Sequence, residues 1–262
     1  NYESVPYPFD GLNDMTKGMR TGELITVVAG TGVGKTQVMR EVLYSLIQKD
    51  SGNVGTLFLE EPTRDTGLGV MSIHADKKLH VPDIVYSKEE FDEAYNATLG
   101  TGRVFLYDSF GSNTVDRIVS MVRYLARSCE CKFIILDHIS IVVSDHAKDE
   151  RKALDEIVTK LKTLTIELDI CLLMVSHLSR DKSKKSPEEG GNINLQDIRG
   201  SAGIAQLSNI ILALERNTQA EDEIERNTTK VRVVKNRFTG ETGVADSLLY
   251  SKHTGRLKSY GG

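Results

Sequence analysis

The segment AGTGVGKT at residues 29–36 has the residue types and spacing of a loop that binds phosphate groups. It matches the pattern G-x-x-x-x-G-K-[ST], except that Ala29 stands at the first glycine position. Glycines let consecutive backbone N–H groups curl around a phosphate, and a helix that begins there points its positive dipole end at the same anion. Lys35 would then reach the β- and γ-phosphates, and the Thr36 hydroxyl would bind Mg²⁺. The predicted nucleotide-binding residues of the loop are Gly30, Thr31, Gly32, Val33, Gly34, Lys35 and Thr36.

The context that this motif requires is also present. An apolar stretch at 24–29 predicts a buried strand before the loop, and an amphipathic stretch at 36–48 predicts a helix after it. A plain glycine-rich turn between a strand and a helix is the remaining alternative. A dinucleotide-binding turn is disfavoured, because the third glycine comes one residue early and Lys35-Thr36 follows it.

Nucleotide hydrolysis also needs a carboxylate that holds the metal and a group that orients water. Asp137 ends the apolar run 132–137, at the edge where a parallel sheet meets its ligands, so we assign it to Mg²⁺. Glu60 ends the run after the phosphate-loop helix, and as general base it would polarise the attacking water. Both assignments compete with ordinary acidic residues at strand ends. His177 ends another apolar run, where a lone histidine is more often structural.

Apolar, β-branched runs alternate with amphipathic stretches along most of the chain. They predict strands at 24–29, 54–60, 103–108, 132–137 and 170–177, and helices at 36–48, 63–78, 88–99, 115–129 and 150–168. Near-continuous hydrophobicity in the strands is typical of a mainly parallel sheet covered by helices on both faces. Later runs at 210–214, 230–234 and 247–250 are expected to extend the sheet through hairpins. The sequence therefore predicts an α/β fold, in a single domain over 1–262.

Composition limits the partners that the chain can have. Its 262 residues carry a formal net charge of −4, with a pI near 5.9, so any contact with nucleic acid must be local. No apolar run approaches the roughly 20 residues of a membrane span, and the first residues do not resemble a signal peptide. Three cysteines, Cys129, Cys131 and Cys171, favour a reduced intracellular protein over a disulfide scaffold. No second pair at zinc-finger spacing accompanies them.

Several further motifs, in their order and spacing, resemble one protein family. They are LFLEE at 57–61, LDHISIVVS at 136–144, SH at 176–177, DIRGSAGIAQLSN at 197–209, ALERN at 213–217 and KNRFTGETG at 235–243. With the phosphate loop, they resemble the helicase domain of the replicative helicase–primases of T-seven-type phages and, more distantly, mitochondrial Twinkle and bacterial DnaB. The resemblance covers the chain from Gly11 onward. It implies a RecA-like core that hydrolyses ATP or dTTP with Mg²⁺.

The resemblance also implies roles for single residues within one subunit. Glu60 falls at the family's catalytic glutamate, Asp137 at its Mg²⁺ aspartate and His177 at its histidine sensor. Gln206 matches a glutamine that also reads the state of the γ-phosphate.

Other matched positions concern the base and the neighbouring subunit. Arg216 and Tyr250 match a pair that sandwiches the nucleotide base. Arg237 matches an arginine finger that enters the neighbour's site, although without the family it is only an arginine at a strand end. Hydrolysis is therefore expected to depend on assembly into a homo-oligomeric ring, a hexamer.

A polar stretch at 179–191 is predicted to be a loop. Its clustered cations are Arg180, Lys182, Lys184 and Lys185. By themselves they could be a solvated charge run, but the loop follows His177 and matches the family's DNA-tracking loop. If copies of this loop converge at the centre of a ring, they would form a positively charged channel although each subunit is acidic overall. No aromatic residue interleaves the cations, so the contacts with single-stranded DNA should fall on phosphates.

The first ten residues are too short for the helix that family members lend to a neighbour, and they resemble a remnant of a linker to an N-terminal domain. Primase activity is not assigned to this chain, although a primase domain and a replicative polymerase are possible partners in the cytoplasm of a phage-infected bacterium. A RecA-like recombinase or a KaiC-like ATPase is the main alternative, and the KNRFTG segment argues against it. A nucleotide-switched assembly protein is disfavoured by Glu60 and the arginine finger.

Overall fold

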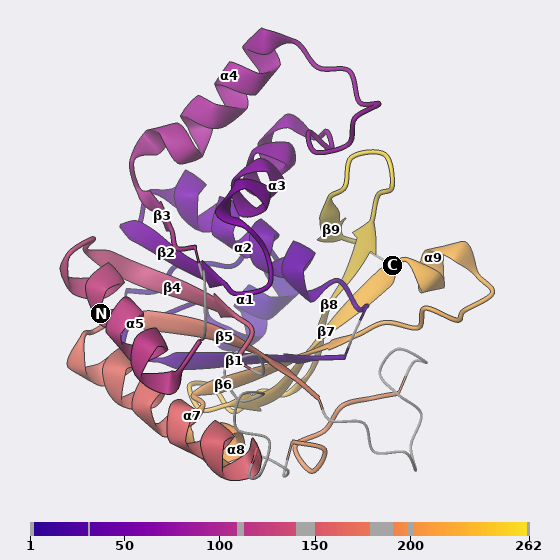
Figure 1. Cartoon of the computed structure of the whole chain (residues 1–262). Helices are drawn as coiled ribbons and strands as arrows, with labels where there is room; N and C mark the ends of the chain where they lie inside the picture. Colours follow the sequence, from indigo (N-terminus) through magenta and orange to yellow (C-terminus); the bar gives the residue numbers. More distant parts are fainter. Residues whose placement is uncertain are drawn as a thin grey trace.

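The structure is a computed structural model that describes residues 3–30, 32–108, 113–139, 150–178, 191–198 and 202–260. Within these residues the strands form one nine-stranded sheet with helices packed on both faces (Figure 1). No helix in these ranges is long and apolar enough to cross a membrane. Cys129, Cys131 and Cys171 are free and buried.

The sheet has a parallel part and an antiparallel part. Its strands are β1 (Leu24–Ala29), β2 (Asn53–Phe58), β3 (Val104–Leu106), β4 (Cys131–Asp137), β5 (Cys171–His177), β6 (Ile210–Glu215), β7 (Thr228–Asn236), β8 (Gly243–Tyr250) and β9 (Leu257–Ser259). Their order is β3-β2-β4-β5-β1-β6-β7-β8-β9. Neighbours from β3 to β6 are parallel, whereas β6 to β9 are antiparallel. The predicted mainly parallel sheet with C-terminal hairpin strands is therefore confirmed.

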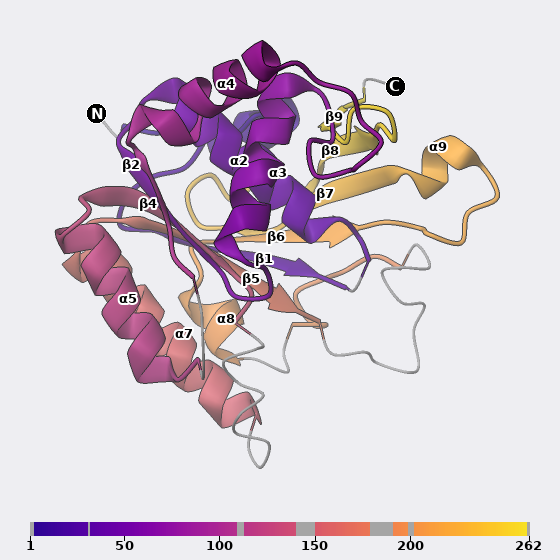
Figure 2. The same ribbon diagram turned by 45° about the horizontal axis from the view of Figure 1, so that its top comes forward.

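Helices cover both faces of the sheet, as Figure 2 shows. They are α1 (Asp10–Thr16), α2 (Lys35–Lys49), α3 (Thr63–Ala75), α4 (Lys88–Ala97), α5 (Val115–Arg127), α7 (Glu150–Glu167), α8 (Ala202–Leu207) and α9 (Glu223–Arg226), with a 3₁₀ turn at Leu99–Thr101. In both views α2 and α3 lie on one face, and α5 and α7 lie on the other.

The central strand β1 shows why the sheet is a rigid platform. All six of its residues are buried. Ile25 and Val27 pack into the core on the α2 side, whereas Leu24 and Val28 pack into the core on the α7 side. Successive side chains of a strand point to opposite faces, so a strand covered on both faces is apolar throughout. Each large apolar side chain that is fully buried stabilises the folded state by roughly 1.5–3 kcal/mol. The strand that carries the phosphate loop is therefore held firmly in the core.

Some boundaries differ from the predicted ones. Strand β2 ends at Phe58, so Glu60 lies in the connection just past the strand rather than within it. Strand β8 begins at Gly243, before the predicted run at 247–250, because its first half is a partly exposed hairpin strand without a continuous apolar run. The helices α1, α8 and α9 were not predicted, and each has seven residues or fewer.

Candidate nucleotide-binding site

The phosphate loop lies between the end of β1 and the start of α2. Gly32 and Gly34 have φ values of 77° and 85°, which a residue with a side chain rarely adopts. Gly34 caps the N-terminus of α2, so the helix begins at Lys35 with its dipole directed into the loop. The loop is also tied to the C-terminal hairpin, because the Thr229 hydroxyl donates to the Val33 carbonyl oxygen at 3.0 Å. Thr31 lies outside the described residues.

The order β2-β4-β5-β1 brings the ends of four strands beside this loop. Lys35 Nζ lies 2.6 Å from His177 Nε2, after β5, and 3.7 Å from Glu60 Oε2, after β2. The Thr36 hydroxyl donates to Asp137 Oδ2 at 3.1 Å, and Lys35 Nζ lies 3.8 Å from Asp137 Oδ1. All five side chains that were singled out from strand ends and from the loop therefore meet at one point.

Asp137 and Thr36 have the donor chemistry of a magnesium site. Within the described residues, Asp137 Oδ1 is a buried oxygen with no hydrogen-bond partner. Burial raises the pKa of Asp137, while Lys35, His138 and Thr36 act in the opposite direction. A buried carboxylate oxygen without a donor, next to a hydroxyl oxygen, fits a hard divalent cation such as Mg²⁺.

His138, which the sequence reasoning did not single out, belongs to the same cluster. Its side chain is buried, with Nε2 2.8 Å from Glu60 Oε1, and its ring meets that of His177 edge-on at 4.1 Å between centroids. Burial and the nearby His138 and Lys35 lower the pKa of His177 to about 4, so His177 is neutral at pH 7 and accepts from Lys35. Partial burial raises the pKa of Glu60, but His138 and Lys35 outweigh it and keep the carboxylate charged.

Three ligand atoms, from Glu60, His138 and His177, lie within 4.8 Å of one another. They are close enough to hold a metal ion by distance alone. The ammonium group of Lys35 lies beside the Glu60 and His177 atoms, however, and already supplies a positive charge there.

Glu60 and Glu61 are adjacent but have different surroundings. The Glu61 carboxylate accepts from Arg40 at 2.7 Å and from the Thr66 hydroxyl at 2.8 Å, and it is largely buried between α2 and α3. The Glu60 side chain is 55% exposed and faces Lys35. Of these two carboxylates, only that of Glu60 is therefore available to a ligand in the phosphate loop.

Arg216 and Tyr250 lie near each other, on either side of Asn227. Arg216 donates to the Arg226 carbonyl oxygen at 2.7 Å and to Asn227 Oδ1 at 3.4 Å, and the Tyr250 N–H donates to the Asn227 carbonyl oxygen at 2.9 Å. Tyr250 also lines a cavity of about 230 Å³. Other lining residues are Gln37 and Arg40 of α2, Lys78, His80 and Gly255. The cavity therefore joins the tyrosine ring to the helix that follows the phosphate loop.

Arg237 and Gln206 are not brought to the phosphate loop of their own subunit. The Arg237 N–H donates to the Asn209 carbonyl oxygen at 3.0 Å, and the Asn209 N–H donates to the Leu24 carbonyl oxygen at 2.9 Å. Leu24 begins β1 and the loop follows its other end, roughly 16 Å away at the usual rise of a strand. The Arg237 guanidinium donates to the Gln206 carbonyl oxygen at 2.7 Å, so these two residues lie together. Arg180, Lys182, Lys184 and Lys185 lie outside the described residues.

Comparison of the fold with solved structures defines the class of protein. A solved ATPase domain superposes with a TM-score of 0.83 at 21% identity, covering all of this chain and 93% of the other. A solved DnaB-like replicative helicase gives 0.82 at 20% identity, over all of this chain and 63% of that one. A KaiC-like protein from Pyrococcus horikoshii gives only 0.65 at 16%, covering both chains in full. The fold is therefore that of the RecA-like ATPase domains of helicases.

Sequence comparison then identifies the family. Residues 4–259 match the DnaB-like helicase C terminal domain, and the chain belongs to this family. The chain is 38% identical to the DNA helicase/primase of Enterobacteria phage T3, over 98% of this chain and 46% of that protein. It is 27% identical to the replicative DNA helicase DnaB of Helicobacter pylori, over 81% of this chain and 44% of that protein. The chain thus spans about half the length of the curated relatives it matches. The family predicted from the motifs is confirmed.

Proposed function

We propose that the chain is the motor domain of a ring-forming replicative DNA helicase, in which hydrolysis of ATP or dTTP at subunit interfaces drives translocation on single-stranded DNA and duplex unwinding. The observation that carries the proposal is the meeting of Lys35, Thr36, Asp137, Glu60 and His177 at one edge of the sheet. Family membership supports the action on DNA, because the matched relatives are named a DNA helicase/primase and a replicative DNA helicase.

Within one subunit, the residues of the edge would divide the work of hydrolysis. Lys35 would leave His177 and Glu60 to bind the β- and γ-phosphates, on the backbone N–H groups of the loop. Thr36 and Asp137 would hold Mg²⁺, which would neutralise charge on the phosphate oxygens. Glu60 would accept a hydrogen bond from the attacking water, and neutral His177, freed from Lys35, would sense the γ-phosphate.

The remainder of the site would come from a second copy of the chain. Arg237 is exposed and lies at the opposite end of β1 from its own phosphate loop, so a neighbour's triphosphate is the one that it could reach. A head-to-tail interface of this kind generates a ring where its rotation closes and a filament where it does not, and we propose a closed hexamer. Gln206, whose carbonyl oxygen accepts from Arg237, would meet the γ-phosphate of the same neighbour beside the finger. Arg216 and Tyr250 would hold the base.

We further propose that the loop with Arg180, Lys182, Lys184 and Lys185 lines the channel of the ring and binds the phosphates of single-stranded DNA. The whole chain would act as one domain, in which Tyr7 and Phe9 already belong to the core. A primase domain or primase partner, and a replicative polymerase, would work with it in the cytoplasm of the infected bacterium.

Stimulation of hydrolysis by single-stranded DNA, followed by strand displacement from a forked duplex, tests this function. A helicase should give both responses, a RecA-like recombinase only the first, and an assembly switch neither. Replacing Lys182, Lys184 and Lys185 with Ala should abolish the stimulation and leave DNA-independent hydrolysis intact. Unchanged stimulation in that triple variant would remove the loop from the DNA channel.

A further inference from the structure

The turn that carries Arg237 is fastened to the N-terminal segment of the chain. The Asn236 side-chain amide and the Thr239 hydroxyl both donate to the Met15 carbonyl oxygen, at 2.9 and 2.7 Å. Asn236 Oδ1 in turn accepts from the backbone N–H groups of Phe238 and Thr239, at 3.2 and 3.1 Å. The side chains of Asn236 and Thr239, on both sides of Arg237, therefore bind the turn to the end of α1.

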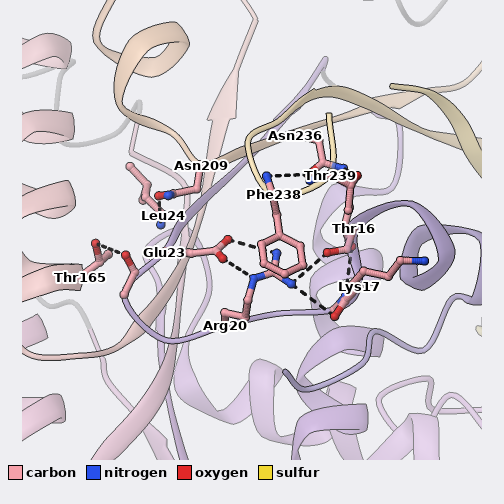
Figure 3. Close-up of polar contacts among 12 residues, drawn as sticks. Thr16, Lys17, Arg20, Glu23, Leu24, Thr165, Asn209, Asn236, Phe238 and Thr239 are labelled. Carbon is pink, nitrogen blue, oxygen red and sulfur yellow. Dashed lines mark hydrogen bonds and ion pairs between the residues drawn. The ribbon is translucent and has the colours of Figure 1, made fainter. Parts of the chain in front are cut away.

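Arg20 provides a fixed platform beneath the same turn. Its side chain is 5% exposed, and its guanidinium is held by the Glu23 carboxylate and by the carbonyl oxygens of Thr16 at 3.0 Å and Lys17 at 3.3 Å. The Phe238 ring lies flat over this group, with its centroid 3.7 Å from Arg20 Cζ (Figure 3). A cation shielded from water attracts the face of an aromatic ring more strongly than an exposed one does.

The contacts of Arg20 and of Phe238 indicate which of the two residues the stack holds in place. Arg20 has charge and hydrogen-bond partners without Phe238, so its burial does not require the ring. Phe238 is 43% exposed and contributes little apolar burial to the core. The stack therefore holds the backbone of Phe238 in place, and Arg237 is the residue directly before Phe238.

We propose that Arg20 and Phe238 are positioning residues for Arg237: their stack, together with the bonds to Met15, holds the turn so that the arginine is presented to the neighbouring subunit. The inference rests on the proposed role of Arg237 in that neighbour's site. A second anchor supports it, because the Asp246 carboxylate of β8 accepts from the N–H of Leu12 at 2.6 Å, at the other end of α1. The N-terminal segment thereby fixes the position of the hairpin formed by β7 and β8.

The test measures hydrolysis in the assembled protein with single-stranded DNA. Phe238→Ala should lower kcat about 10- to 100-fold, since a displacement of about 1 Å in a group that contacts the reacting atoms can cost that much. The nucleotide KM should not change, because Phe238 lies on the turn at the opposite end of β1 from the phosphate loop. The melting temperature should fall by no more than a few degrees, since one cation–π contact is lost. Phe238→Tyr, which keeps a ring over Arg20, should restore most of the rate. Tyr124→Ala, which removes a ring that is 54% exposed on α5, is the matched control and should behave as wild type.

A double variant decides whether Phe238 acts through Arg237. In single turnovers with the protein in excess, so that slow rates stay measurable, Phe238→Ala/Arg237→Ala should be no slower than Arg237→Ala. Multiplied losses, a wild-type kcat in Phe238→Ala, or failure of Phe238→Tyr to restore the rate would each overturn the positioning role. Wild-type turnover in Arg237→Ala would be a different failure, because it would remove the finger itself and the proposal with it.

Discussion

Under the proposed function the two ends of β1 would carry two halves of one reaction, and they are built differently. At its carboxyl end, groups from four neighbouring strands already touch within a single subunit, with Asp137 buried and Lys35 nearly so. At its amino end, Arg237 stands exposed on a hairpin turn, and its guanidinium is bound to the Gln206 carbonyl oxygen. One half of the proposed site is therefore completed by folding, and the other half would be completed only by assembly.

The difference follows from how each end is held. Parallel strands buried on both faces hold their carboxyl ends close to one another, so the side chains that follow these strands can meet. A hairpin at the antiparallel side has solvent around it, and its turn is held by a few polar contacts to α1. Variants at the two ends should consequently differ in whether a second subunit can rescue them.

Arg237→Ala should give the largest loss, about 10³- to 10⁵-fold in kcat, because the finger would stabilise charge in the transition state of the neighbour's reaction. Nucleotide binding by the variant should be retained, since its own phosphate loop is intact. Mixing it with Lys35→Ala should recover hydrolysis at about a quarter of the sites, because half of the subunits keep Lys35 and half of those meet an intact arginine. Steady-state turnover of the one-to-one mixture measures this. A mixture no more active than its two parents would place Arg237 in its own subunit's reaction or outside it.

Glu60→Gln should lower kcat by about 10²- to 10⁴-fold while nucleotide stays bound, because an amide cannot take up the proton of the attacking water. The adjacent Glu61→Gln is the control. Its carboxylate binds Arg40, so its loss should lower the free energy of unfolding by roughly 1–3 kcal/mol and leave turnover within about twofold of wild type. Turnover and thermal melting of both variants separate chemistry from stability. Equal turnover losses in the two variants would contradict the assignment of the base to Glu60.

The carboxyl end could be predicted from sequence because its chemistry follows a regular pattern. Apolar runs that end in Asp137 or His177 indicate parallel strands, and parallel strands bring their ends to one edge. Once the phosphate-loop strand and the Asp137 strand lie in one parallel sheet, Lys35, Thr36 and Asp137 must meet at its carboxyl edge. The base was assigned to Glu60 from its place at the end of the apolar run. The contact that occupies Glu61, with Arg40 of a helix that precedes it in the chain, appears only in the structure.

The hairpin end was less predictable for physical reasons. Arg237 was recognised through its motif, but its support comes from Arg20 and Met15, more than two hundred residues earlier, and no local pattern announces such contacts. The short helix α1 lacks the length for a periodic signal, and β8 mixes polar with apolar residues. Long-range polar contacts of this kind are fixed by the fold as a whole.

His138→Asn should give the smallest loss of kcat among these site variants. It tests whether a side chain at the carboxyl end of β1 needs support beyond the sheet itself. Glu60 is more than half exposed, and its other ion-pair partner among the described residues is Lys35, which must move to the phosphates. Without the imidazole, Glu60 would sample more rotamers, so kcat should fall less than about tenfold, equivalent to under about 1.4 kcal/mol, with nucleotide affinity unchanged. Turnover and nucleotide binding measured side by side with Glu60→Gln give the comparison. A loss as large as that of Glu60→Gln would mean that His138 takes part in the proton transfer itself, and no loss would mean that the sheet edge alone orients the base.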